Sequence, residues 1–298
     1  MQPARNTLFT ILTVGFLISC ASGASAEIVF EEGIEYANPD DQHLKLNLAR
    51  PAEIKAGERL PAILCIHGGG FRAGDRKGWD AFCRKLADRG YVAVTVTYRL
   101  APKYPFPAAV YDVKAAVQWL RSNADKYHID PDRIGTVGDS AGGHLALFLG
   151  VTGGVSQFDP PADKAIGGTV PSSKVQCVVS FYGPSDFTKS YGKSVDAAEV
   201  LPLWLGGDLE HERRRHIESS PLYWVTPHAA PTLLLHGTQD KYVAYEQAVW
   251  IHDRLKAADV DVEMVTFEGA GHGFKGEDRD RADKAAMEFF DKRLNKKG

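Results

Sequence analysis

Short, almost wholly apolar runs recur along the chain and constrain its fold more than any other feature of the sequence. Those of strand length are 62–66, 91–97, 134–137, 176–181, 232–235 and 262–267. Such runs are typical of strands that are buried on both faces of a sheet. Helix-compatible stretches lie between them, at about 77–89, 106–124, 141–150, 243–257 and 279–294. Strands that alternate with helices predict one α/β domain, with a mostly parallel central sheet and helices on both faces.

Two segments depart from this pattern. Apolar and polar residues alternate within 28–50, most clearly in HLKLNL at 43–48, which predicts short N-terminal strands. The stretch from about 151 to 225 fits the strand–helix rhythm least. We interpret its second half, about 186–225, as an excursion over the carboxyl edge of the sheet, where open α/β sheets bind their ligands.

The first 26 residues have the pattern of an export signal. Arg5 is their only charged residue, an apolar stretch runs from Leu8 to Ile18, and ASA at 24–26 forms a small-residue cleavage site. The apolar run is shorter than the roughly 20 residues that a membrane-spanning helix needs. LISC at 17–20 also resembles a lipobox. We therefore expect an exported protein without a transmembrane span, either released or lipid-anchored at Cys20, whose α/β domain covers residues 27–298.

The charge balance limits the class of partner. The 298 residues include 35 Lys and Arg against 38 Asp and Glu, a net charge of −3. A chain without a basic excess lacks the electrostatic footprint of nucleic-acid binding. No spacing of cysteines resembles a zinc site. The sequence therefore predicts no nucleic-acid partner, no metal and no organic cofactor, and it leaves the oligomeric state open.

The segment GDSAG at 138–142 matches the pattern G-x-S-x-G. The strand expected at 134–137 enters it, and a helix-compatible stretch leaves it. In this strand–turn–helix setting the turn is strained and presents the serine side chain at the N-terminus of the helix. We therefore predict that Ser140 is the nucleophile of a hydrolase.

A serine hydroxyl is a poor nucleophile, so it needs a base and a third group that orients the base. In this setting an acid and then a histidine follow the serine along the chain. His272 lies in a glycine-rich loop after the last expected strand, and Asp240 follows the strand at 232–235. We predict that His272 is the base and Asp240 the acid. The alternatives are Asp186 as the acid and His67, His144 or His236 as the base.

HGGG at 67–70 comes directly after the strand at 62–66. A loop of glycines lets backbone N–H groups approach an oxyanion, and we predict Gly69, Gly70 and the N–H of Ala141 as its donors. A phosphate cradle is the alternative, but no G-K-[ST] follows. Four aromatic residues are candidates for contact with an acyl group or a sugar, with core packing as the alternative for each: Phe71, Tyr104, Trp204 and Trp224.

These motifs resemble those of the α/β-hydrolase carboxylesterases, a group that includes the hormone-sensitive-lipase-like esterases and the bacterial acetylxylan/feruloyl esterases. HGGG at 67–70, GDSAGG at 138–143 and YRLAP at 98–102 carry the resemblance, which covers about 45–295. It implies an α/β-hydrolase fold. It also implies a triad of Ser140, Asp240 and His272, with N–H donors at Gly69, Gly70 and Ala141.

The details favour the acetylxylan/feruloyl branch. HGGGFRAGD at 67–75 is closer to that branch, and the acid lies in HGTQD at 236–240, in place of the D-P-[LI]-x-D-E segment usual in hormone-sensitive-lipase-like enzymes. We expect a serine carboxylic-ester hydrolase that acts through an acyl-enzyme on acetyl or feruloyl esters of plant-wall polysaccharide, or on similar short-acyl esters. The alternatives are an arylformamidase-type hydrolase and a catalytically silent binding protein on the same scaffold.

Overall fold

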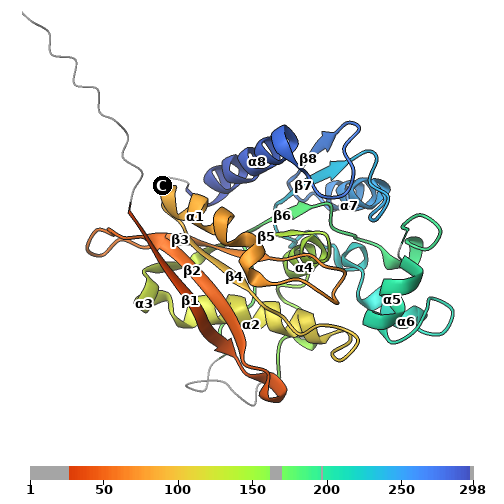
Figure 1. Ribbon diagram of the computed structural model, residues 1–298, viewed down its shortest axis with the longest axis horizontal. Coiled ribbons are helices and arrows are strands. Elements are labelled where there is room, and N and C mark those ends of the chain that lie inside the picture. Colours follow the sequence, from red (N-terminus) through yellow and green to blue (C-terminus); the bar gives the residue numbers. More distant parts are fainter. Residues whose placement is uncertain (1–26, 162–169, 196, 296–298) are drawn as a thin grey trace, which may run out of the picture.

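The computed structural model describes residues 27–161, 170–195 and 197–295, so the expected export signal and Cys20 lie outside the described part. One twisted sheet runs through the molecule, with its strands in the order β1-β2-β4-β3-β5-β6-β7-β8 (Figure 1). The strands are β1 (Ile28–Ala37), β2 (Leu44–Pro51), β3 (Leu60–Ile66), β4 (Val92–Val96), β5 (Ile129–Asp139), β6 (Cys177–Phe181), β7 (Thr232–Gly237) and β8 (Val262–Phe267). β2 is antiparallel to both of its neighbours, β1 and β4, and all other pairs are parallel.

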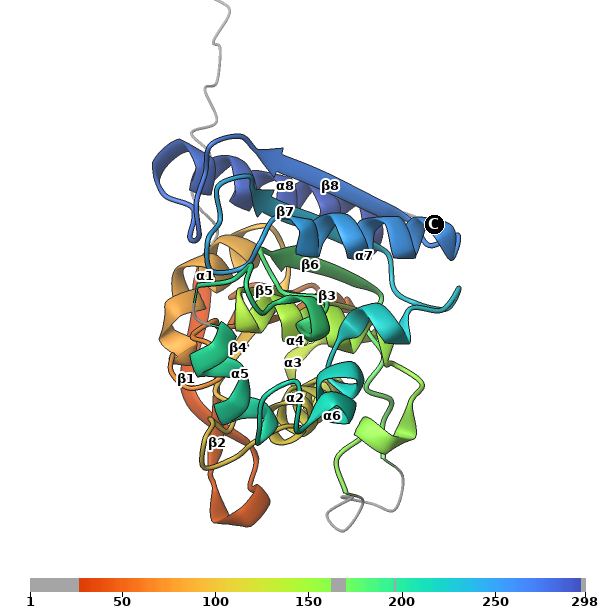
Figure 2. The same cartoon turned by 90° about the vertical axis from the view of Figure 1, so that its right-hand side faces the viewer.

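Helices cover both faces of this sheet. The helices of the described residues are α1 (Asp80–Asp88), α2 (Ala108–Ser122), α3 (Ala124–Tyr127), α4 (Ala141–Val151), α5 (Ala197–Leu205), α6 (Arg213–Glu218), α7 (Glu246–Ala257) and α8 (Gly276–Leu294). α1 and α8 pack together on one face, and α2, α4 and α7 pack on the other (Figures 1 and 2). The prediction of an α/β fold with a mostly parallel sheet is confirmed.

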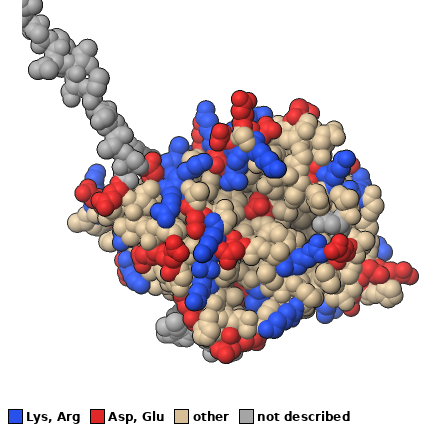
Figure 3. All heavy atoms as spheres, viewed as in Figure 1, with Lys and Arg blue, Asp and Glu red and all other residues tan. Residues whose placement is uncertain are grey.

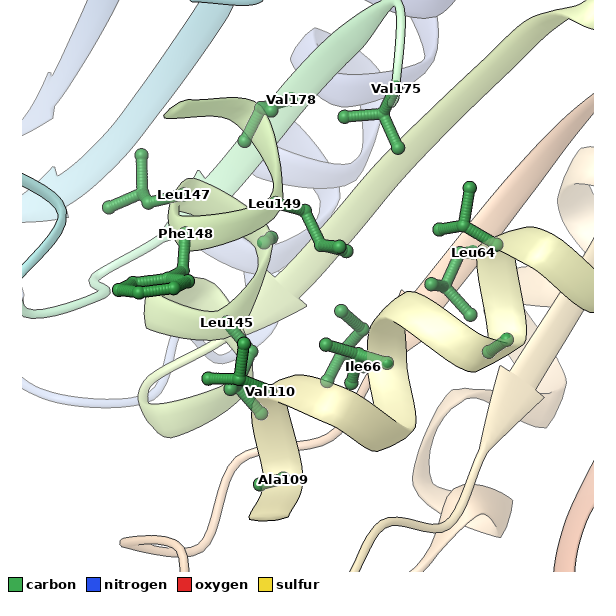
Figure 4. Packing of buried hydrophobic residues seen from close by; sticks show 14 of the residues in the cluster. Leu64, Ile66, Ala109, Val110, Leu145, Leu147, Phe148, Leu149, Val175 and Val178 are labelled. Atoms are coloured by element: carbon green, nitrogen blue, oxygen red, sulfur yellow. The ribbon is translucent and has the colours of Figure 1, made fainter. Parts of the chain in front are cut away.

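The central strands are mostly apolar because each of their faces meets a helix layer. In β3, Leu64 and Ile66 point toward α2 and α4, while Ile63 and Cys65 point toward α1 and α8. Figure 4 shows the first of these layers, where Leu64 and Ile66 lie close to side chains of α2 and α4. Alternating side chains that are buried on opposite faces leave few polar positions in such a strand. This packing fixes the carboxyl ends of the strands as a rigid platform.

The segment between β6 and β7 leaves both helix layers. After the 3₁₀ turn η5 (Phe187–Lys189) it forms α5 and α6, and it returns through the 3₁₀ turn η6 (Pro221–Trp224). Figure 1 shows α5 and α6 together at one side of the molecule, apart from the helices that cover the sheet.

On the face seen in Figure 3, acidic and basic side chains are interspersed, and neither sign of charge dominates. Many of them form ion pairs, such as Lys85 with Asp283 and Arg89 with Asp291. Among the helices of the described ranges, none combines the length and the apolar character that a membrane span requires.

Candidate active site

The carboxyl ends of the parallel strands bring the predicted site residues to one edge of the sheet. Ser140 follows β5, Asp240 follows β7, His272 follows β8 and the glycine loop 67–70 follows β3. Within the sheet Ile66 pairs with Gly138, so the glycine loop and Ser140 leave the sheet side by side. The edge is therefore built from neighbouring strands that are distant in the sequence.

Ser140 stands in a strained turn between β5 and α4. Its φ and ψ of 52° and −119° are unusual for a residue with a Cβ atom. The flanking glycines allow this turn because the chain is packed too closely for larger side chains. A Cβ atom on Gly138 would lie 2.3 Å from the carbonyl oxygen of Gly142, and one on Gly142 would lie 2.1 Å from that of Ile66. The turn thus presents the serine hydroxyl at the N-terminus of α4.

Hydrogen bonds connect Ser140, His272 and Asp240 in one chain. Nε2 of His272 lies 3.0 Å from Oγ of Ser140, and Nδ1 lies 2.7 Å from Oδ2 of Asp240. A carboxylate only accepts hydrogen bonds, so Nδ1 carries the proton and Nε2 is free to accept one from the hydroxyl. The structure therefore places the predicted nucleophile, base and acid in mutual contact.

The Asp240 carboxylate is held by donors on both of its oxygens. Oδ1 accepts hydrogen bonds from the N–H groups of Tyr242 and Val243, both at 2.9 Å. Oδ2 faces His272, with Nε2 of His236 3.4 Å away. Burial by itself raises the pKa of Asp240, but the nearby His236, whose Nε2 is hydrogen-bonded to the carbonyl oxygen of Val243, and the hydrogen bond with His272 outweigh burial and hold the pKa well below its usual range. The carboxyl group is thus ionised at neutral pH.

Two tyrosines flank the His272 ring. The Tyr182 ring lies 4.7 Å from it, nearly edge to face, and the Tyr242 ring lies 5.4 Å from it on the open side of the site. Tyr182 is buried and has a positive φ of 41°, directly after β6. These rings restrict the orientations that the imidazole can adopt.

The glycine loop is anchored by the residue that precedes the nucleophile. Oδ1 of Asp139 accepts hydrogen bonds from the N–H of Gly68 and from Nε1 of Trp79, both at 2.9 Å. Gly69 and Gly70 follow with φ values of 115° and 58°, which favour glycine. Among the described residues, no backbone or side-chain group accepts a hydrogen bond from the N–H of Gly69 or Gly70. Ala141 opens α4, where the first N–H groups have no partner within the helix.

These groups line a single cavity of about 460 Å³. Ser140 and His272 form part of its wall, and so do the three predicted oxyanion donors. Other parts of the wall come from Tyr182, Tyr242 and the excursion between β6 and β7, which contributes Phe187, Ala197, Val200 and Leu201. Five of the six predicted catalytic and oxyanion residues thus line one space, and the sixth, Asp240, lies behind His272, to whose Nδ1 it is hydrogen-bonded.

Of the four aromatic residues that we considered for substrate contact, only Phe71 lines this cavity. Trp204 is 1% exposed and stacks face to face on Phe71 from behind, at 3.8 Å. Tyr104 lies beneath the Arg99 guanidinium, and Trp224 packs against Phe158. None of these three residues lines the described cavity, so their interpretation as substrate contacts is corrected to core or surface packing.

The alternative acid and bases have other structural roles. Asp186 caps η5 by accepting a hydrogen bond from the N–H of Thr188. The His67 ring stacks on Tyr98 at 4.3 Å, and burial lowers its pKa. His144 is fully buried in α4 and bonded to the carbonyl oxygen of Pro184, and burial lowers its pKa to about 3. His236 supports Asp240. None of these four side chains makes a described hydrogen bond to Ser140.

The sequence reasoning missed several residues of the site. Asp139 was visible only as the variable position of G-x-S-x-G. Tyr182 directly follows the strand 176–181, as Asp240 follows the strand at 232–235. Its place after a strand of the parallel sheet was the signal that could have identified it. The α5 residues gave no signal, because the excursion lacks a strand–helix rhythm.

The fold and this arrangement of side chains define the class of protein: an α/β-hydrolase of the carboxylesterase type. The chain belongs to the BD-FAE family, whose model matches residues 46–255. It is 33% identical over 221 residues to esterase LipC of Mycobacterium tuberculosis, which covers 72% of this chain and 53% of that protein. It is 30% identical to an ethyl acetate hydrolase of Pseudomonas putida over 79% of this chain and 72% of that protein.

Solved structures agree with this assignment. A truncated carbohydrate esterase from gut microbiota superposes with a TM-score of 0.76 at 27% identity, over 91% of this chain and 98% of that one. A propionate-bound esterase from Thermogutta terrifontis gives a TM-score of 0.72 at 29% identity, over 92% of this chain and 97% of that one. The chain spans about half the length of the mycobacterial curated relatives.

Proposed function

We propose that this protein is a serine carboxylic-ester hydrolase that works through an acyl-enzyme on Ser140. The observation that carries the proposal is the continuous hydrogen-bonded chain from Oγ of Ser140 through His272 to Asp240 at the mouth of a cavity. Gly69 and Gly70 line the same cavity, and their N–H groups make no hydrogen bond within the described ranges. Relatives that are named esterases support the same conclusion.

In the first half of the proposed reaction, Oγ of Ser140 attacks the ester carbonyl while Nε2 of His272 takes the hydroxyl proton. Asp240 stabilises the imidazolium that forms. The carbonyl oxygen becomes an oxyanion and accepts hydrogen bonds from the amides of Gly69, Gly70 and Ala141. When the tetrahedral intermediate collapses, the bond to the alcohol breaks and Nε2 gives its proton to the departing oxygen.

In the second half, water attacks the acyl-enzyme. His272 takes a proton from the water, the same amides hold the second oxyanion, and the proton returns to Oγ of Ser140 as the acid leaves. Ser140, His272 and Asp240 thus return to their starting protonation states. One oxyanion donor is worth about 3–4 kcal/mol in the transition state, so the glycine loop contributes substantially to the rate.

For the substrate we propose acetyl or feruloyl esters of plant-wall polysaccharide, or similar short-acyl esters. The HGGGFRAGD segment at 67–75 supports this class, and so does the similarity to a carbohydrate esterase from gut microbiota. Residues 1–26 predict export, and an exported enzyme would meet such polymers outside the cytoplasm.

The test compares kcat/KM of the full chain on acetylated xylo-oligosaccharide, methyl ferulate and p-nitrophenyl butyrate. A preference for either wall-derived substrate supports the substrate proposal, and efficient cleavage of the butyrate alone overturns it. N-formylkynurenine in the same assay tests the arylformamidase alternative. An active-site label such as a fluorophosphonate should modify wild type, whereas a catalytically silent scaffold should not react.

Replacement of the nucleophile tests the mechanism. Ser140→Ala should lower kcat by about 10⁶-fold, because the acyl-enzyme can no longer form. It should also abolish labelling by the fluorophosphonate. The matched control is Ser156→Ala, an exposed serine in the turn Ser156–Phe158, which should keep wild-type activity. Esterase activity that survives in Ser140→Ala would assign the nucleophile elsewhere.

A further inference from the structure

If the proposed function holds, the positions of His272 and the oxyanion amides fix where the alcohol and the acyl chain of an ester lie in the cavity. The departing oxygen must come within hydrogen-bond reach of Nε2 of His272, so the alcohol lies on the side of His272, Tyr242 and Gly273. The carbonyl oxygen faces the amides of the glycine loop and Ala141. The acyl chain takes the remaining direction, toward the wall that Phe71, Phe187 and α5 form.

The wall on the acyl side is closed. Phe71 and Phe187 are each 2% exposed, and Val200 and Leu201 of α5 are 6% and 4% exposed. α5 also lies directly against the oxyanion loop, because a Cβ atom on Gly70 would be 3.4 Å from a methyl group of Val200. The part of this wall that Phe71, Phe187 and α5 supply is thus apolar, with Ser190 and Ser194 beside it, and it lies close to the oxyanion loop.

Two contacts hold α5 in this position. Trp204 at the end of α5 stacks on Phe71 with the rings 3.8 Å apart and 6° from parallel. Glu199 of the same helix forms an ion pair with Arg72, the next residue of the loop. A helix that is fixed at both points cannot move away from a longer acyl chain without breaking packed aromatic contacts.

The wall on the alcohol side is open. The Tyr242 side chain beside His272 is 52% exposed, and Val195 is 69% exposed. These two residues lie next to each other, since the N–H of Val195 donates a hydrogen bond to the carbonyl oxygen of Lys241 at 2.9 Å. Of the two, Tyr242 lines the cavity, so its exposed ring gives a bulky alcohol an apolar surface to contact, whereas Val195 lies outside the cavity lining.

We propose that α5 is the floor of the acyl side, with Val200 as the residue that limits acyl length, and that the enzyme selects short aliphatic acyl groups on bulky alcohols. This inference rests on the proposed function and narrows it. It favours acetyl esters of carbohydrates over feruloyl esters, because the aromatic acyl group of a ferulate would meet Val200 and Phe187.

The experiment measures kcat/KM for p-nitrophenyl acetate, butyrate and octanoate, and for methyl ferulate, with wild type and with Val200→Ala. Wild type should prefer acetate or butyrate over octanoate. Val200→Ala should raise the octanoate-to-acetate ratio by about 10-fold or more, the discrimination that one or two methylene groups give in an apolar pocket. A second variant, Leu201→Ala, should act in the same direction.

The matched control is Leu203→Ala. Leu203 is on the same helix and 37% exposed, and it does not line the described cavity, so its loss should leave the ratio unchanged. Thermal unfolding of each variant shows that it is folded. A folded Val200→Ala with the wild-type ratio, or a wild type that prefers octanoate or methyl ferulate, overturns the inference while leaving ester hydrolysis intact. If wild type cleaves none of these esters, the proposed function itself fails.

Discussion

Asp139 links the nucleophile to the oxyanion loop through a single side chain. Its backbone pairs with Phe181 at the end of β5, which fixes the position of Ser140 beside it. Its carboxylate accepts hydrogen bonds from the N–H of Gly68 and from the Trp79 indole. Gly68 directly precedes the two amides that face the cavity. The residue therefore sets the distance between the hydroxyl that attacks and the amides that receive the charge.

Asp139→Ala should lower kcat on p-nitrophenyl acetate by about 10- to 100-fold with a small change in KM. The expected loss is smaller than the 10²–10³-fold effect of removing an oxyanion donor, because the donors remain and only their support is lost. Asp139→Asn keeps an oxygen that can accept both hydrogen bonds, so it should restore most of the rate. Steady-state kinetics of both variants test this, and a wild-type kcat in Asp139→Ala would exclude the positioning role.

At the scale of elements, the first turn of α4 meets the sheet without intervening side chains. Its first turn contains Gly142 and Gly143, whose added Cβ atoms would lie 2.1 Å from the carbonyl oxygen of Ile66 and 2.8 Å from that of Phe181. Both of those oxygens belong to the backbone and cannot rotate away. The close approach holds α4 between β3 and β6 and fixes the direction in which Ser140 points.

Gly142→Ala should therefore lower the free energy of unfolding by about 3 kcal/mol or more, the upper range for overpacking against a rigid neighbour. Urea unfolding followed by circular dichroism measures the change. The matched control is Gly154→Ala, where an added Cβ atom meets nothing within 4 Å, and the expected change is within about 0.5 kcal/mol. Equal stabilities of the two variants would show that α4 can shift to make room.

The sequence predicted the strands, the helices and the chemistry of this edge because each depends on local pattern. The strand predicted at 262–267 is found at the same residues, and the turn at 138–142 contains the glycines that it needs within its own sequence. Trp204 shows the limit of such reasoning. An aromatic residue in an apolar stretch can face a ligand or the core, and only the packing of α5 on the glycine loop turns this ring onto Phe71. The role of Val200 depends on the same long-range contact.

For the molecule as a whole, several buried histidines link folding to pH. Burial lowers the pKa of His67, of His144 and of His216, which lie in different parts of the fold. His144 is affected most, with a pKa of about 3. Its Nδ1 hydrogen-bonds to Pro184, while Nε2 has no partner among the described residues. The folded state therefore keeps these rings neutral, whereas the unfolded chain protonates them near pH 6.5.

The sign of the pH effect follows from proton uptake. Below pH 6.5 the unfolded state binds a proton at His144, whereas the folded state binds it only near pH 3. The free energy of unfolding therefore falls as the pH decreases from 6.5 toward 3. The slope for one such group approaches about 1.4 kcal/mol per pH unit, which amounts to about 2 kcal/mol between pH 7 and pH 5. The lowered pKa of Asp240 acts in the same direction, but only below about pH 4.

His144→Asn removes this group and tests its share of the acid sensitivity. The variant should be less stable than wild type at pH 7, because a smaller side chain leaves a void beside Phe187 and Trp204. Its stability should nevertheless fall by about 2 kcal/mol less than that of wild type between pH 7 and pH 5. Urea unfolding at both pH values measures the difference, with the exposed His228→Asn as the control. Parallel pH curves for wild type and His144→Asn would mean that the loss of stability in acid arises from other groups.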